Sequence, residues 1–429
     1  MSPDATVTHL FGAAAIILVV ANGAGLLARK LGQPSIVGQL IAGICFGPSL
    51  LTQVWPAAER TLFPPAIAPM LTALSQVSLV LFLYFVGYEL DLGTLRSRSR
   101  ATLTVALAAF LVPMAVGTGA ALLFHGELER LGVPHDMSAS TTLFLGVALS
   151  ITAVPVLVVV VRENGLAGTV PGVVAVAAAG LIDVVGWATL AGTLIHSAGG
   201  SGMSLPLRLV LLLVTVLVMV WPARLLLRWF MRLPNVPFAA QLAVLIGFAF
   251  AAAWATSALG LHAIFGALLA GAVTPREPDG TLSPELVRSL DNIGSLLLPF
   301  FFVVSGQAVS VGALNGTAFV VLVVVTVLAV VAKAGPGTLA ARACGLDNRT
   351  SLTIGALLST RGLTELIALN AGFQAGLLSA RLYTVLVLMA VATTLLTQPL
   401  LALVRGFRAT GADSQPSPSP VSAAAPGRS

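Results

Sequence analysis

The chain has 429 residues, of which 57% are hydrophobic and only 9% are charged, and its mean hydropathy is +0.99. Soluble globular proteins carry about 25% charged residues, so this composition excludes a water-soluble fold of this size. The formal net charge of +6 does not indicate a nucleic-acid partner, because the basic residues lie singly or in small groups between apolar stretches.

Apolar stretches that can cross about 30 Å of hydrocarbon as helices recur along the whole chain. Porin-like alternation of polar and apolar residues is absent, so we expect an all-α polytopic bundle in the lipid bilayer. The sequence predicts about 13 spans, at residues 9–28, 35–51, 70–88, 101–124, 140–161, 171–195, 206–226, 239–258, 260–274, 291–308, 314–338, 351–372 and 381–404.

The distribution of the 22 basic residues predicts the orientation of these spans. Most of them lie in the loops that follow odd-numbered spans, whereas the loops after even-numbered spans hold only Arg60, Arg130, Arg208 and Arg381. The positive-inside rule therefore predicts a multi-pass protein of a cell membrane with its N-terminus outside and its C-terminus in the cytoplasm. High Ala, Val and Arg with little Lys indicates a GC-rich bacterial genome.

Four ionisable residues fall well inside predicted spans, and such residues are costly enough in a membrane to indicate function. They are Asp183, Lys333, Arg361 and Glu365. Asp183 lies near the middle of the sixth span, where its neighbours in the segment AGLIDVVG cannot neutralise it. Because burial penalises the charged carboxylate, we expect this group to bind a proton or a cation. The alternative is a neutral carboxylic acid that donates a hydrogen bond between helices.

The fifth predicted span, TLFLGVALSITAVPVLVVVV, contains a proline, Pro155. Pro155 removes a backbone donor and frees a carbonyl near Ile151, and Ser150 and Thr152 place hydroxyl groups at the same depth. Free backbone groups are tolerated there only against protein or a watery cavity, and unwound carbonyls bind sodium-like ions. The alternative is an ordinary proline kink whose free groups are satisfied by the neighbouring hydroxyls.

The twelfth predicted span, SLTIGALLSTRGLTELIALNAGF, has Arg361 four residues before Glu365, within reach on one helical face. These two side chains predict a buried ion pair that holds a discontinuous helix in place. Lys333, in the eleventh span, either extends toward the cytoplasmic surface or balances charge within the membrane. The fifth and twelfth spans are seven apart and so run in opposite directions, which predicts two inverted six-helix repeats whose broken helices cross at the binding site.

Several segments resemble the monovalent cation:proton antiporter-2 family, with a membrane domain of the sodium/hydrogen exchanger type. The segments are LGQPSIVGQLIAGICFGPSLL, LVLFLYFVGYELDLGTLR, ALSITAVPVLVVVVRENG and GALLSTRGLTELIALNAG, and the resemblance extends over residues 31–401. It implies a homodimer. Residues 1–100 and 197–310 would form a scaffold and dimer domain, residues 101–196 and 311–404 a moving core, and residues 405–429 a disordered cytoplasmic tail.

The resemblance also implies roles for individual residues. It assigns ion and proton binding to Asp183, Thr152 and Ser150, and charge balance to Lys333, Arg361 and Glu365. The family usually has Asp-Asp or Asn-Asp in the sixth span, whereas this chain has Ile182 before the shared aspartate. An apolar Ile182 cannot bind a cation, so Asp183 would hold either a proton or a monovalent cation. One-for-one electroneutral exchange follows if Lys333 stays charged.

We therefore predict a secondary active transporter that exchanges protons for Na+ or K+ by alternating access, with no enzymatic activity and no cofactor. One alternative is a proton-driven exporter of an organic anion or a hydrophobic metabolite on the same fold. Another is a receptor or scaffold built on the same frame, which would not require Asp183.

Overall fold

The computed structural model describes residues 3–89, 100–133, 137–197, 205–259, 261–275, 282–314 and 316–406. Within these ranges every regular element is a helix, which confirms the predicted all-α class. The predicted disordered tail, residues 405–429, lies outside the described residues except for its first two, which end the last helix, α19 (Ala380–Gly406).

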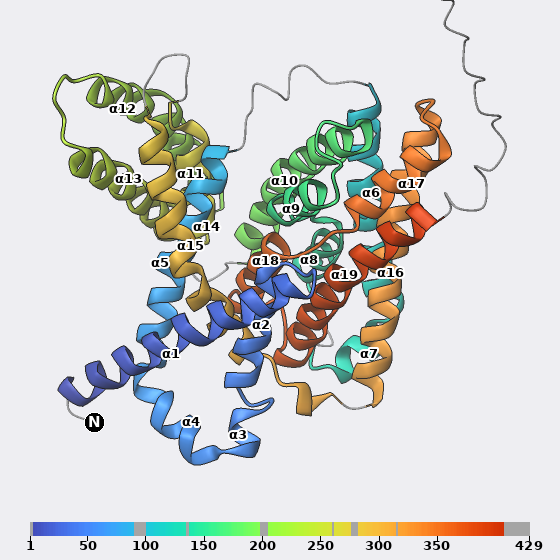
Figure 1. Cartoon of the computed structure of the whole chain (residues 1–429), viewed down its shortest axis with the longest axis horizontal. Coiled ribbons are helices and arrows are strands. Elements are labelled where there is room, and N and C mark those ends of the chain that lie inside the picture. Colours follow the sequence, from blue (N-terminus) through green and yellow to red (C-terminus); the bar gives the residue numbers. More distant parts are fainter. Residues whose placement is uncertain are drawn as a thin grey trace, which may run out of the picture.

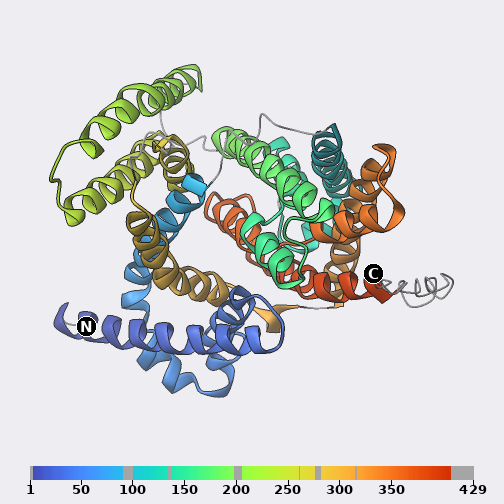
Figure 2. The ribbon, with the colours of Figure 1, turned by 45° about the horizontal axis from the view of Figure 1, so that its top comes forward.

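The helices form two groups, which lie on the left and right of Figures 1 and 2. The first group contains α1 (Pro3–Lys30), α2 (Ser35–Phe46), α3 (Leu51–Val54), α4 (Pro56–Leu62), α5 (Ala68–Glu89), α11 (Leu205–Val218), α12 (Arg224–Met231), α13 (Phe238–Ala258), α14 (Ala263–Val273) and α15 (Pro284–Gln307). In this group α5 packs against both α14 and α15, and α2 packs against α1 and α15. A π-helical turn at Met219–Ala223 joins α11 to α12 and contains Pro222, a residue that cannot continue the regular hydrogen bonding.

The second group joins two segments that are far apart in the sequence. It contains α6 (Arg100–Leu123), α7 (His125–Arg130), α8 (Ala139–Ser150), α9 (Val154–Glu163), α10 (Val170–Ser197), α16 (Gly316–Ala343), α17 (Asn348–Leu358), α18 (Leu363–Gln374) and α19. Helix α16 packs against α6, α17 and α19, and α10 packs against α6, α8 and α17. The roles predicted for the two groups, a scaffold and a moving core, stay predictions.

The number of membrane-spanning helices is not confirmed as thirteen. Among the described residues, eleven helical segments are long and apolar enough to cross a membrane, while α8 and α14 are apolar but shorter. The predicted span 140–161 is in fact two short helices, α8 and α9, on either side of a break. A criterion of helix length therefore misses this span, because the break divides it into two short helices.

Close contact between α2 and α15 depends on Gly43, inside α2, and on Gly47, which directly follows the last residue of α2. A Cβ atom added at Gly43 would lie 2.7 Å from the carbonyl oxygen of Phe302, and one added at Gly47 would lie 2.8 Å from the Cα of Gln307. Because both neighbours are backbone atoms, a larger residue would force the helices apart. Small residues commonly allow such close helix contacts within membranes.

Candidate ion-binding site

The first break in the second group lies between α8 and α9. Helix α8 ends at Ser150, the backbone is extended at Ile151 and Ala153, and α9 begins at Val154. Pro155 occupies the first turn of α9, where its missing N–H is not needed. The break predicted from Pro155 is confirmed, and it leaves the last carbonyl groups of α8 without partners in their own helix.

The second break lies between α17 and α18 and touches the first. Gly362 immediately precedes α18 with a φ of 153°, a backbone conformation that favours glycine. A Cβ atom at Gly362 would lie 2.8 Å from Cγ2 of Val156 and 3.7 Å from Cβ of Ala153. The two broken helices therefore cross at their breaks, as the sequence predicts.

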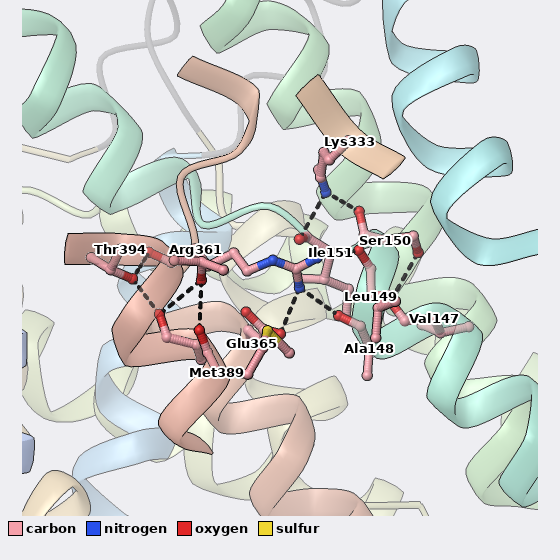
Figure 3. A network of polar contacts seen from close by, with 12 residues as sticks. Val147, Ala148, Leu149, Ser150, Ile151, Lys333, Arg361, Glu365, Met389 and Thr394 are labelled. Atoms are coloured by element: carbon pink, nitrogen blue, oxygen red, sulfur yellow. Dashed lines mark hydrogen bonds and ion pairs between the residues drawn. The ribbon is translucent and has the colours of Figure 1, made fainter. Parts of the chain in front are cut away.

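Two buried, positively charged side chains donate hydrogen bonds to the end of α8 (Figure 3). Arg361 donates to the carbonyls of Ala148 at 3.0 Å and Leu149 at 2.5 Å. Lys333 donates to the next two carbonyls, those of Ser150 and Ile151. A helix C-terminus carries a partial negative charge of about half an elementary charge, so these side chains stabilise a helix end that would otherwise be costly to bury.

Lys333 and Arg361 are both fully buried, so Lys333 does not extend toward a membrane surface. No carboxylate among the described residues lies within 4.0 Å of the Lys333 ammonium group, whose hydrogen bonds go to the α8 carbonyls. Arg361 also forms an ion pair with Glu365, with 2.6 Å between Nη1 and Oε1 and both side chains fully buried. This contact was predicted from their spacing and is confirmed.

Asp183 lies in the middle of α10 and is 1% exposed. The backbone N–H of Val154, at the positive end of α9, lies close to its carboxylate, and Lys333 acts on it electrostatically. A Cβ atom at Gly186, one turn further along α10, would lie 3.3 Å from Cγ1 of Ile151. Oδ1 of Asp183 is buried and has no hydrogen-bond partner among the described residues.

The other predicted ligands differ in how their hydroxyl groups are used. Thr152 is fully buried, and its Oγ1 has no hydrogen-bond partner in the described part of the chain. The hydroxyl of Ser150 donates to the carbonyl of Val147 at 2.9 Å, within its own helix. Ile182 belongs to the same apolar cluster as Val156. Thr152 is therefore better placed than Ser150 to supply a free oxygen.

Two further polar residues at the crossing, Thr360 and Thr394, were not singled out from the sequence. Oγ1 of Thr360 and Oε2 of Glu365 are buried and find no partner within the described ranges, and Thr394 donates its hydroxyl to the carbonyl of Arg361 at 2.9 Å. Unpaired buried polar atoms are few in folded proteins. Thr394 could have been found from the polar pair Thr393–Thr394 inside the last predicted span.

Crossed broken helices with buried charges at the crossing are typical of one design of secondary active transporter. Residues 14–403 of the sequence match the family described as sodium/hydrogen exchanger, transmembrane. The chain therefore belongs to the sodium/hydrogen exchanger family of multi-pass membrane proteins.

Named relatives support this membership. The Na+/H+ antiporter NhaS4 of Synechocystis sp. is 31% identical over 395 residues, which cover 91% of this chain and 95% of that protein. The K+/H+ antiporter 1 of Saccharomyces cerevisiae is 30% identical over 403 residues, but this chain spans only 46% of its length. The sodium proton antiporter MjNhaP1 from Methanocaldococcus jannaschii has the same fold, with a TM-score of 0.66 over 95% of this chain and 99% of that chain at 15% identity.

Proposed function

We propose that this protein exchanges protons for a monovalent cation, Na+ or K+, across a cell membrane by alternating access, with Asp183 holding each in turn. The family supports antiport, and the relatives include proteins named as Na+/H+ and K+/H+ antiporters. The observation that carries the site is the unpaired Oδ1 of Asp183, buried beside the crossing together with the unpaired Oγ1 of Thr152. Ser150 takes part in the site through its backbone carbonyl, which accepts a hydrogen bond from Lys333, whereas its hydroxyl is bonded within α8.

The charges at the crossing favour electroneutral exchange. Lys333 and Arg361 supply two positive charges, while Glu365 and ionised Asp183 supply two negative ones. A proton on Asp183 and a monovalent cation bound beside it change the net charge by the same amount, so the two loaded states are electrically equivalent. Since an unloaded carboxylate is costly in an apolar environment, the protein would change conformation only when Asp183 carries one or the other.

The moving part in this proposal is the second group, residues 101–196 and 311–404, which contains both breaks and all four deep charges. The first group, residues 1–100 and 197–310, would act as the scaffold. A homodimer formed through the scaffold, with the N-terminus outside and the C-terminus in the cytoplasm, belongs to the same proposal.

There is little free space between α2 of the first group and the breaks of the second. A cavity beside the breaks, lined by Val156, Gly362, Leu366 and Thr394 among others, has a volume of about 10 Å³. A cavity needs roughly 10–15 Å³ to hold one water molecule. An organic anion or hydrophobic metabolite would require the two groups to separate far more widely around this point.

The experiment that tests the proposal measures proton movement in everted vesicles with a pH-sensitive dye. Sodium, potassium and lithium are added in turn to vesicles that contain the wild type, Asp183→Asn or Asp291→Asn. Asp291 lies on α15 in the first group, so it provides a matched acid-to-amide control. We expect cation-dependent dequenching for the wild type and the control, and none for Asp183→Asn.

Two results would contradict the proposal. Exchange retained by Asp183→Asn would remove Asp183 from the site, and a wild type that responds to none of the three cations would favour the exporter. A membrane current at saturating cation in proteoliposomes would contradict the electroneutral stoichiometry while leaving antiport itself intact.

A further inference from the structure

A large apolar cavity lies within the second group, apart from the crossing of the broken helices. It has a volume of about 580 Å³ and lies between α6, α7, α8, α16 and α19. Small-molecule sites in proteins are typically roughly 300–1,000 Å³ and mostly apolar. The walls include Ala121, Leu128, Leu145, Leu149, Val321 and Val325.

The cavity reaches the lipid-facing surface of α16. Val320 and Val324 line it and are 60% and 46% exposed, and Val327 and Val331 continue the same exposed row along the helix. In a membrane this row contacts hydrocarbon, so the cavity is accessible from the bilayer. A polar ligand would lose its hydrogen bonds to water on entering such a space, whereas an acyl chain would not.

One end of the cavity carries a pair of opposite charges. Glu127 lines this end and forms an ion pair with Arg130 at 2.7 Å. Both residues lie on α7, and their side chains are 39% and 67% exposed. The pair is complementary to a headgroup that contains both a phosphate and an ammonium group.

The cavity is also lined by Leu149, whose carbonyl accepts a hydrogen bond from Arg361. The volume of about 580 Å³ is within the range of roughly 300–1,000 Å³ that is typical of small-molecule sites. Its volume and its one polar end thus suit a single long acyl chain with a headgroup at α7.

We propose that this cavity binds one acyl chain of a phospholipid from the leaflet on the α7 side, with its phosphate–ammonium headgroup against Glu127 and Arg130. All the walls belong to the second group, so the lipid moves with that group and leaves its surface toward the first group free. The bound chain holds α6, α8 and α16 together beside the end of α8 to which Arg361 and Lys333 bind. This site does not depend on which cation is transported, or on antiport itself.

The test uses photolabelling of the purified full chain in proteoliposomes. The probe is a phosphatidylethanolamine with a photoreactive diazirine near the end of one acyl chain, and labelled residues are identified by peptide mass spectrometry. We expect label at the inner wall, on Leu145, Leu149 or Val325. Ala121→Phe, which places a ring in the cavity from a residue only 5% exposed, should reduce that label several-fold.

Leu122→Phe is the matched control, because Leu122 is the next residue of α6 and is 62% exposed; it should leave the inner label unchanged. Val321→Phe fills the cavity from α16 and replaces Ala121→Phe if that variant does not fold. The same probe with a phosphatidylglycerol headgroup should label the inner wall more weakly. The site would be overturned if the label were confined to the exposed row of α16, or if the filled variants and the control had equal label at the inner wall. Equal labelling by the two headgroups would overturn the role of Glu127 and Arg130.

Discussion

The loss of Arg361 should destabilise the protein more than the loss of its acidic partner. Arg361 is fully buried, and it donates to Glu365 at 2.6 Å and to two carbonyls at the end of α8. Arg361→Met leaves the Glu365 carboxylate buried without its cation, and removing one partner of a buried pair costs roughly 3–5 kcal/mol. Glu365→Gln keeps an acceptor oxygen and leaves Arg361 bonded to the carbonyls, so its cost is at most roughly 1.5–3 kcal/mol.

The decisive comparison is the effect of Glu365→Gln in two backgrounds. In the wild type it should lower the free energy of unfolding, but in Arg361→Met it should raise it, because it removes the uncompensated carboxylate. Residues in direct contact typically show coupling of roughly 0.5–3 kcal/mol. Denaturant titration of the four purified proteins in one detergent measures the cycle. Glu365→Gln that destabilises both backgrounds, with effects additive within about 0.5 kcal/mol, would refute the reasoning.

Three further predictions use the same unfolding measurement. Lys333→Met should cost roughly 1–3 kcal/mol more than Lys333→Gln, because only the amide can still donate to the α8 carbonyls; equal costs would contradict this. Gly362→Ala should cost roughly 1–3 kcal/mol of stability because the backbone at this position has a φ of 153°. Adding Val156→Ala should restore only the part of that loss that comes from the contact between the new Cβ and Val156. If Gly362→Ala left the stability unchanged, the backbone at Gly362 would not be strained for other residues. The hydrogen bond from the side chain of Thr350 holds the pKa of Asp347 below its ordinary value. The stability lost in Asp347→Asn should therefore be fully present above that ordinary value and vanish as the pH falls through the lowered pKa; a difference independent of pH would contradict it.

The breaks in both helices could be predicted from the sequence because their causes are local. Pro155 cannot continue the hydrogen bonding of the fifth predicted span, and Gly362 permits a backbone angle that other residues avoid. The Arg361–Glu365 pair follows from a spacing of four residues. The burial of Asp183 follows from its position at the centre of an apolar run.

The partners of Lys333 could not be predicted in the same way. Lys333 binds the carbonyls of Ser150 and Ile151, which lie 183 and 182 residues earlier in the chain. No periodicity in either segment indicates that α16 passes the end of α8. The hydrogen bond from the hydroxyl of Ser150 to the carbonyl of Val147 was not predicted either. At the end of a helix, the carbonyls of the preceding turn are the nearest acceptors for a serine hydroxyl.

In the proposed function a single carboxylate serves two ions, and the charges around the crossing support that proposal. The carbonyls at the end of α8 accept hydrogen bonds from Lys333 and Arg361, and Glu365 forms an ion pair with Arg361. Neither Asp183 nor Lys333 has an ion-pair partner within 4.0 Å in the described structure, but Lys333 donates to two backbone carbonyls, whereas Oδ1 of Asp183 has no partner. Ile182 packs with the apolar cluster and adds no second acid beside it. The charge of the site therefore changes by one unit, whether Asp183 takes up a proton or a cation, and the proposed electroneutral exchange follows from that single group.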